Sequence, residues 1–163
     1  MGQEKVPGPR SALIVEPKRQ LCLAIRALLL KLGTLDTTIA ADSDAARKYL
    51  DTLKPGLIVC GFDLQPLAGP DFVRYVRRVT ADIAETPIIM AIAHPDADRV
   101  AAARDAGVDE ILAVPVTGAA LDKRWHAIIH NRRPFVRAPG YTGPDRRRIT
   151  AEWYDGPERR KGV

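Results

Sequence analysis

The chain of 163 residues lacks the features that mark secreted, disulfide-rich and membrane-spanning proteins. Its two cysteines, Cys22 and Cys60, both lie inside apolar runs, which indicates buried thiols in a reducing compartment and excludes a disulfide framework. No stretch reaches the roughly 18 consecutive apolar residues of a membrane helix, and the polar residues 1–10 have no apolar centre of a signal peptide. We therefore expect a cytoplasmic protein whose first ten residues form a flexible leader.

Motifs for catalysis and for cofactor binding are also missing. The sequence contains neither a Walker loop nor a Gly-rich dinucleotide fingerprint. Of its three histidines, His94 is remote, while His126 and His130 have helical spacing but no evident third ligand for a metal ion. We expect no metal, no cofactor and no enzymatic activity.

What is present is a regular alternation of short apolar runs and amphipathic segments. The runs cover residues 12–15, 37–40, 57–60, 87–93 and 110–114, and the third shows no polar alternation, as in a parallel sheet that is covered on both faces. A segment with helical spacing follows each run, over roughly 17–33, 43–53, 69–76, 95–106 and 117–130. The pattern predicts an α/β fold with a doubly wound, five-stranded parallel sheet, whose reactive edge lies at the carboxyl ends of the strands.

Two stretches of this pattern carry a resemblance to the receiver domain of two-component response regulators. One stretch is similar to the third strand of a receiver and the loop after it: Leu57-Ile-Val-Cys-Gly-Phe-Asp-Leu-Gln-Pro-Leu-Ala-Gly. The other is similar to the approach to the fifth strand of a receiver: Ala106-Gly-Val-Asp-Glu-Ile-Leu-Ala-Val-Pro. The similarity covers about residues 11–130. It implies a CheY-like, flavodoxin-like fold for this part of the chain.

The resemblance also implies where a receiver would accept phosphate, and these positions hold unsuitable residues. Glu16 alone remains of the acidic pair that holds the metal, and Gly61 occupies the phosphoacceptor position. Ile92 replaces the hydroxyl residue, and Val114 replaces the lysine. Glycine has no nucleophile, and one carboxylate cannot supply the oxygen ligands of Mg²⁺. Asp63 is an alternative acceptor, but a phosphoryl group there would lack the neutralising lysine and hydroxyl. We expect a pseudo-receiver that serves as a scaffold.

The charge of the protein is concentrated at the end of the chain. Residues 131–163 hold nine of the 25 Lys and Arg residues but four of the 20 Asp and Glu residues, which leaves 16 of each sign in residues 1–130. This segment has few apolar residues and several prolines and glycines, so we expect a tail that is disordered when free of ligand. Its surplus of five positive charges points to an anionic partner.

One phrase occurs twice in this tail, as Tyr141-Thr-Gly-Pro-Asp-Arg-Arg and as Tyr154-Asp-Gly-Pro-Glu-Arg-Arg. Arginine binds phosphate and the O6/N7 edge of guanine through its planar fork, and aromatic rings stack on bases. The acid in each copy can accept hydrogen bonds from the N1 and N2 groups of guanine. A ligand with two guanines, two phosphates and approximate twofold symmetry fits the repeat, and cyclic di-GMP meets this description.

The repeat together with the degenerate receiver resembles the CheY-like cyclic di-GMP effectors with an arginine-rich tail, the Cle family. The resemblance implies a monomeric effector that binds cyclic di-GMP, singly or as a stacked dimer, and then docks on the flagellar motor switch at the flagellated pole. Carried over by motif, the ligand residues are Arg137, Tyr141, Asp145, Arg146, Arg147, Arg148, Trp153, Tyr154, Glu158, Arg159 and Arg160.

Two other interpretations stay open at the level of sequence. The tail would bind nucleic acid or a membrane surface if its arginines merely neutralise phosphates, although the paired acids argue against nucleic acid. Alternatively, the chain is a regulator phosphorylated at Asp63 and the tail is a solvated linker.

Overall fold

Five short strands form a parallel sheet at the centre of the computed structural model, which describes residues 5–148. The strands are β1 (Ser11–Val15), β2 (Asp36–Ala40), β3 (Leu57–Gly61), β4 (Ile88–Ala93) and β5 (Glu110–Val114). Their order is β2-β1-β3-β4-β5, with every neighbouring pair parallel, so the predicted doubly wound sheet is confirmed. Its carboxyl edge comprises the loops that follow these strands, and its amino edge comprises the loops that precede them.

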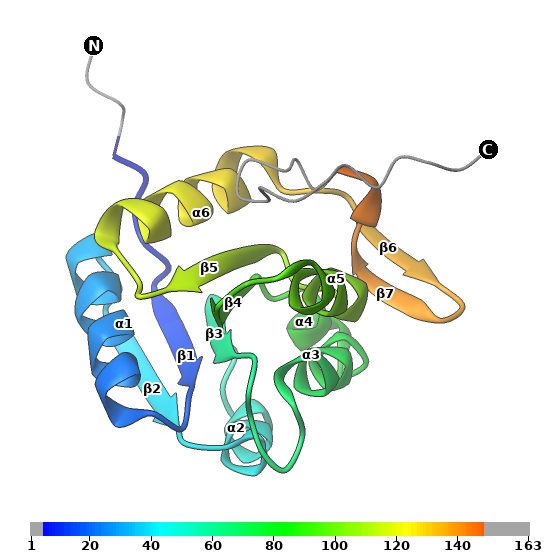
Figure 1. Ribbon diagram of the computed structural model, residues 1–163, viewed down its shortest axis with the longest axis horizontal. Helices are drawn as coiled ribbons and strands as arrows, with labels where there is room; N and C mark the ends of the chain where they lie inside the picture. Colours follow the sequence, from blue (N-terminus) through cyan, green and yellow to red (C-terminus); the bar gives the residue numbers. More distant parts are fainter. Residues whose placement is uncertain (1–4, 149–163) are drawn as a thin grey trace.

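Helices cover both faces of the sheet (Figure 1). One face packs against α1 (Arg19–Leu32) and α6 (Gly118–Asn131), and the other against α2 (Ser43–Leu50), α3 (Gly69–Arg77) and α5 (Ala97–Ala106). A short helix that the sequence pattern did not predict, α4 (Ala81–Ala84), connects α3 to β4. Among residues 5–148, the structure contains no helix that is both long enough and apolar enough to cross a bilayer.

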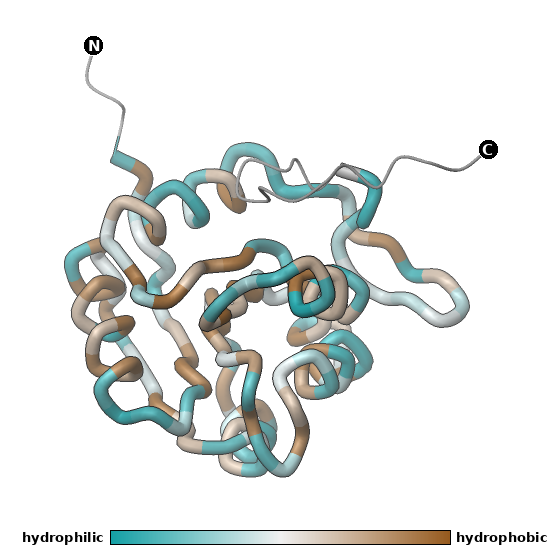
Figure 2. Tube along the Cα trace, in the orientation of Figure 1, coloured by the Kyte–Doolittle hydropathy of each residue, from teal (hydrophilic) through white to brown (hydrophobic). Residues whose placement is uncertain are grey.

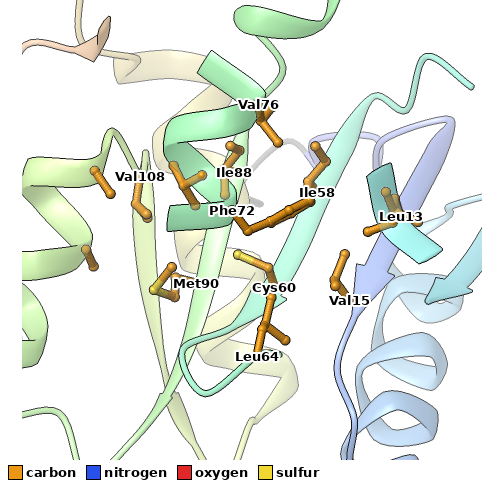
Figure 3. Packing of buried hydrophobic residues seen from close by; sticks show 14 of the residues in the cluster. Leu13, Val15, Ile58, Cys60, Leu64, Phe72, Val76, Ile88, Met90 and Val108 are labelled. Atoms are coloured by element: carbon orange, nitrogen blue, oxygen red, sulfur yellow. The ribbon is translucent and has the colours of Figure 1, made fainter. Parts of the chain in front are cut away.

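The larger of two apolar clusters lies between the sheet and α3. Phe72 is fully buried among Ile58, Cys60 and Met90, as Figure 3 shows. The hydropathy colours in Figure 2 show the corresponding pattern, with hydrophobic strands inside and hydrophilic helix faces outside. Both cysteines are buried free thiols, and burial raises the pKa of Cys60 to about 12. The core therefore needs no covalent or metal support in the described part of the chain.

The amino-terminal segment packs on the α1 and α6 face, which differs from the expected leader. Pro7 accepts a hydrogen bond from Trp125 Nε1 at 2.9 Å, and the amide of Gly8 donates to Leu32 at 3.1 Å. Val6 contacts the apolar cluster on this face, and Pro9 is buried. The ordered body therefore begins before β1, because these backbone groups find partners at the end of α1 and in the middle of α6.

The first half of the arginine-rich tail also differs from the expectation of disorder. After α6 the chain forms the antiparallel strands β6 (Phe135–Ala138) and β7 (Tyr141–Pro144), followed by the 3-10 turn η1 (Arg146–Arg148). Pro139 and Gly140 form the two-residue turn, in which Gly140 has φ 80°, the conformation that a type II turn requires. Figure 1 shows this hairpin against α5 and α3, far from β2.

Candidate functional site

The carboxyl edge of the sheet, where a receiver would accept phosphate, is closed by the chain's own atoms. Glu16 follows β1 directly, and Gly61 is the last residue of β3, one strand away. A Cβ atom on Gly61 would overlap Oε2 of Glu16, so the glutamate carboxylate lies where an acceptor side chain would begin. Glu16 is buried, its Oε1 accepts the amide of Lys18 at 3.0 Å, and burial raises the pKa of its carboxyl.

The remaining positions at this edge offer little for phosphate chemistry. Ile92 is fully buried in β4, and Val114 ends β5 with a short apolar side chain. Asp63 is solvent-exposed and pairs with Arg99 at 3.2 Å. Within residues 5–148, the structure contains no group of three or more metal-ligating side chains. The geometry offers neither a nucleophile at position 61 nor a cation where a lysine would neutralise phosphate.

The amino edge, in contrast, contains a buried arginine. Arg77 comes from α3 and is 1% exposed. Its guanidinium donates to the carbonyls of Gly107, Ala84 and Thr86 at 2.6–2.9 Å and to Oδ2 of Asp109 at 2.9 Å. All five N–H groups of the side chain are thereby satisfied, so Arg77 joins the α4–β4 and α5–β5 loops. Burial lowers the pKa of Arg77, and the Asp109 carboxylate opposes that effect.

Two arginines directly after α6 tie the hairpin to this edge. Arg132 donates to Oδ1 of Asp109 at 2.9 Å and to the carbonyl of Glu85 at 2.5 Å. Arg133 reaches the carbonyls of Val108 and Asp109, and also that of Asp145 on the far side of the hairpin. The base of the hairpin is therefore held by charge-assisted hydrogen bonds to backbone carbonyls.

The glycine of the first repeat copy has a structural role. Gly143 lies against Gly107, the residue that ends α5, and a Cβ on Gly143 would come within 2.8 Å of the Gly107 Cα. Both glycines have positive φ, 155° and 109°. A close approach of two backbones at such φ values is open to glycine and strained for other residues. Part of the repeated phrase is therefore explained by docking on the receiver.

The predicted ligand residues on the hairpin divide into two groups. The guanidinium of Arg146 lies 4.3 Å from the centre of the Tyr141 ring and pairs with Asp105 at 3.4 Å. Arg137 pairs instead with Glu85 at 3.4 Å. Tyr141 pairs with Ala138 across the hairpin, and successive side chains alternate between strand faces, so Arg137 and Tyr141 lie on opposite faces. The structure brings Tyr141 and Arg146 together and separates them from Arg137.

Further predicted residues follow β7. Asp145 is half-buried, and its Oδ1 accepts the backbone amide of Arg147 at 2.9 Å, so the carboxylate starts the η1 turn. The side chain of Arg147 is exposed. The structure gives the backbone of Arg148 in η1 but does not describe its side chain. The other predicted residues lie outside the described residues: Trp153, Tyr154, Glu158, Arg159 and Arg160.

Sequence reasoning missed the residues that hold the hairpin in place. Arg77 occupies an inward position of α3 beside Val73 and Val76, and an arginine within an apolar stripe is the signal that would have found it. Arg132 and Arg133 entered the sequence argument as net charge alone, although a pair of arginines at a helix end was visible.

The fold agrees with the comparisons with known proteins. The model of the response regulator receiver domain matches residues 12–126, and the chain belongs to this family. Receiver domains are signalling modules that act through protein partners. No match was found among the curated proteins.

Solved receiver structures resemble the body of this protein. A response regulator receiver protein from Pseudomonas putida is 26% identical, with a TM-score of 0.62, over 73% of this chain and 97% of that one. The chemotaxis response regulator CheY4 of Vibrio cholerae is 19% identical, with a TM-score of 0.67, over 76% of this chain and 99% of that one. These similarities span nearly the whole of each receiver and about three quarters of this chain.

Proposed function

We propose that this receiver is a cyclic di-GMP effector that works without phosphorylation. The observation that carries the proposal is the contrast in exposed chemistry between the two sheet edges. Glu16 fills the phosphoacceptor position beside Gly61 at the carboxyl edge, whereas the hairpin at the amino edge displays a stacked Tyr141–Arg146 pair. An aromatic face next to a guanidinium suits a purine nucleotide, because the ring stacks on the base and the fork binds phosphate.

The repeat extends this site beyond the described residues. The second copy repeats the aromatic residue, the acid and the two arginines of the first, which suits a ligand with two equivalent halves. On this proposal, the loaded protein is a cytoplasmic, monomeric, non-enzymatic adaptor that docks on the flagellar motor switch at the cell pole. The repeat and its resemblance to the Cle effectors support this partner.

Calorimetric titration of the full chain with cyclic di-GMP, GTP and a short single-stranded oligonucleotide tests the proposal. We expect binding of cyclic di-GMP alone. The substitutions Tyr141→Ala and Arg147→Ala should each weaken that binding by about 1–3 kcal/mol, since one removes a stacking face and the other a fork to base or phosphate. Arg26→Ala, at an exposed arginine of α1 on another face, serves as the matched control.

Two outcomes contradict the proposal. Equal affinity for the oligonucleotide, falling steeply with salt, would indicate a general phosphate binder. Labelling by acetyl phosphate that disappears in Asp63→Asn would indicate a phosphorylated regulator instead. We expect no such labelling, because Asp63 pairs with Arg99 and lacks the lysine and the hydroxyl that would neutralise a phosphoryl group.

A further inference from the structure

A small hollow lies where the hairpin meets the ends of α3 and α5. It has a volume of about 100 Å³, and its lining includes Arg74, Arg77 and Arg78 at the end of α3, Asp105 of α5 and Tyr141 of the hairpin. Sites for whole drug-sized ligands measure roughly 300–1,000 Å³. The hollow therefore suits one group of a larger ligand, with the rest of that ligand lying outside.

The charges around the hollow favour an anionic group. Three arginines and one acid line it. Oδ1 of Asp105, the single acid, lies 3.4 Å both from Arg104 and from Arg146, so its negative charge is already compensated. Two of the three arginines pair with acids outside the lining, so the uncompensated positive charge at the hollow is that of Arg78, and a phosphate would neutralise it.

The three arginines of α3 differ in how far they are already used. Arg77 is buried and fully hydrogen-bonded, so it contributes a fixed field and no free donor. Arg74 forms a surface pair with Asp71 at 2.8 Å. Arg78 is exposed at the end of α3, and no ion pair or hydrogen bond joins its side chain to another residue of the described chain. Arg78 therefore offers a free planar fork at the hollow that Tyr141 also lines.

We propose that α3 completes the ligand site: a phosphate of a cyclic dinucleotide stacked on Tyr141 enters the hollow and is bound by Arg78, with Arg74 as a second cation. This inference rests on the proposed function and deepens it, because it assigns to the receiver body a ligand contact that the tail repeat does not supply. Ligand affinity then depends on the docked hairpin, which couples the nucleotide to the position of α3.

Titration of cyclic di-GMP into full-chain variants tests this assignment. We expect Arg78→Ala to raise the dissociation constant at least about tenfold, the lower range for a lost hydrogen bond to a charged group. Arg78→Lys keeps the charge but loses the two-pronged geometry, so it should fall between Arg78→Ala and the wild type. Arg26→Ala removes one positive charge from α1 and should change the constant by less than about twofold. Because Arg78 is exposed, unchanged thermal unfolding should show that the variants are folded.

The outcomes separate this inference from the proposed function. If the wild type binds cyclic di-GMP and Arg147→Ala weakens binding while Arg78→Ala behaves like Arg26→Ala, the α3 contact is overturned and the effector function stands. Equal losses for Arg78→Ala and Arg26→Ala would likewise reduce Arg78 to a contributor of net charge. If the wild type does not bind cyclic di-GMP, the proposed function and this inference fall together.

Discussion

The two edges of the central sheet differ in the polar groups that they contain. At the carboxyl edge, Gly61, Ile92 and Val114 supply no reactive group, and Glu16 fills the space beside Gly61. At the amino edge, Arg77 and Asp109 form a buried ion pair, and a hairpin from the following segment docks beside it. A sheet of this kind therefore keeps its fold while its polar chemistry moves from one end of the strands to the other.

The loop residues at the two edges can vary more freely than the residues of the core. The sheet depends on apolar packing, in which Phe72 and its neighbours are buried regardless of what the loops contain. Loop residues can then be lost at one edge and gained at the other without disturbing the core. The amino edge of this protein contains buried polar groups, and their removal should lower the free energy of unfolding.

Removal of the buried arginine should have the largest effect, because it tests whether the amino edge depends on its polar contacts. Arg77→Met should lower the free energy of unfolding by about 3–5 kcal/mol, because Asp109 loses its buried cation and keeps only the partly exposed Arg132, and three buried loop carbonyls lose their donor. Urea denaturation measures this loss. Arg74→Met, three residues earlier on α3 at a surface pair with Asp71, should cost less than about 1 kcal/mol. Similar small losses for both would mean that the amino edge is held by apolar packing alone.

A smaller effect is expected where the hairpin meets α5. Gly143→Ala places a methyl group against the backbone of Gly107 at a φ of 155°, so the hairpin must shift outward. We expect a loss of about 1–3 kcal/mol, as for other overpacked sites. Hydrogen exchange should accelerate in β6 and β7 and stay unchanged in β3.

Gly140→Ala provides the matched control for that prediction. Gly140 also has positive φ, but a Cβ there would have no neighbour within 4 Å. The Gly140→Ala variant should therefore have the backbone strain of a positive φ, while its hairpin stays packed against α5. Equal hydrogen exchange in the two variants would refute the assigned Gly143–Gly107 contact.

The smallest expected effect concerns pH at the carboxyl edge. Burial raises the pKa of Glu16, so the folded protein keeps this proton to a higher pH than the unfolded chain does. Stability should therefore fall as pH rises from the usual glutamate range through the raised pKa, with a slope of at most about 1.4 kcal/mol per pH unit. Glu16→Gln keeps an acceptor for the Lys18 amide and should flatten the profile in urea unfolding. An unchanged profile would show that other groups cause the dependence.

The sheet could be predicted from the sequence because its signals are local and repeated. Uninterrupted apolar runs such as Leu57–Gly61 and the glycines that end α1 and α5 specify strands and helix ends independently of the rest of the fold. The hairpin has no such signal. Its strands contain arginine, proline and glycine, and they are held by non-local contacts of Arg133 with Val108 and of Gly143 with Gly107.

The candidate site was predictable in part for the same reason. The repeated phrase placed both Tyr141 and Arg146 among the predicted ligand residues, and the structure brings these two into contact. Arg78 has no distinguishing sequence pattern, since it is one of several arginines on and after α3. Its relevance depends on the hollow that the hairpin creates, which is a property of tertiary structure.

The position of Phe135 has a consequence for the buried ion pair. Its ring lies 5.5 Å from the guanidinium of Arg77. Moving the hairpin away would admit water to Arg77 and Asp109 and raise the local dielectric constant, which weakens their attraction. Thermodynamic reciprocity then requires that whatever fixes the hairpin also strengthens the ion pair, and that whatever strengthens the pair fixes the hairpin. The strength of the Arg77–Asp109 ion pair therefore depends on whether the hairpin is docked.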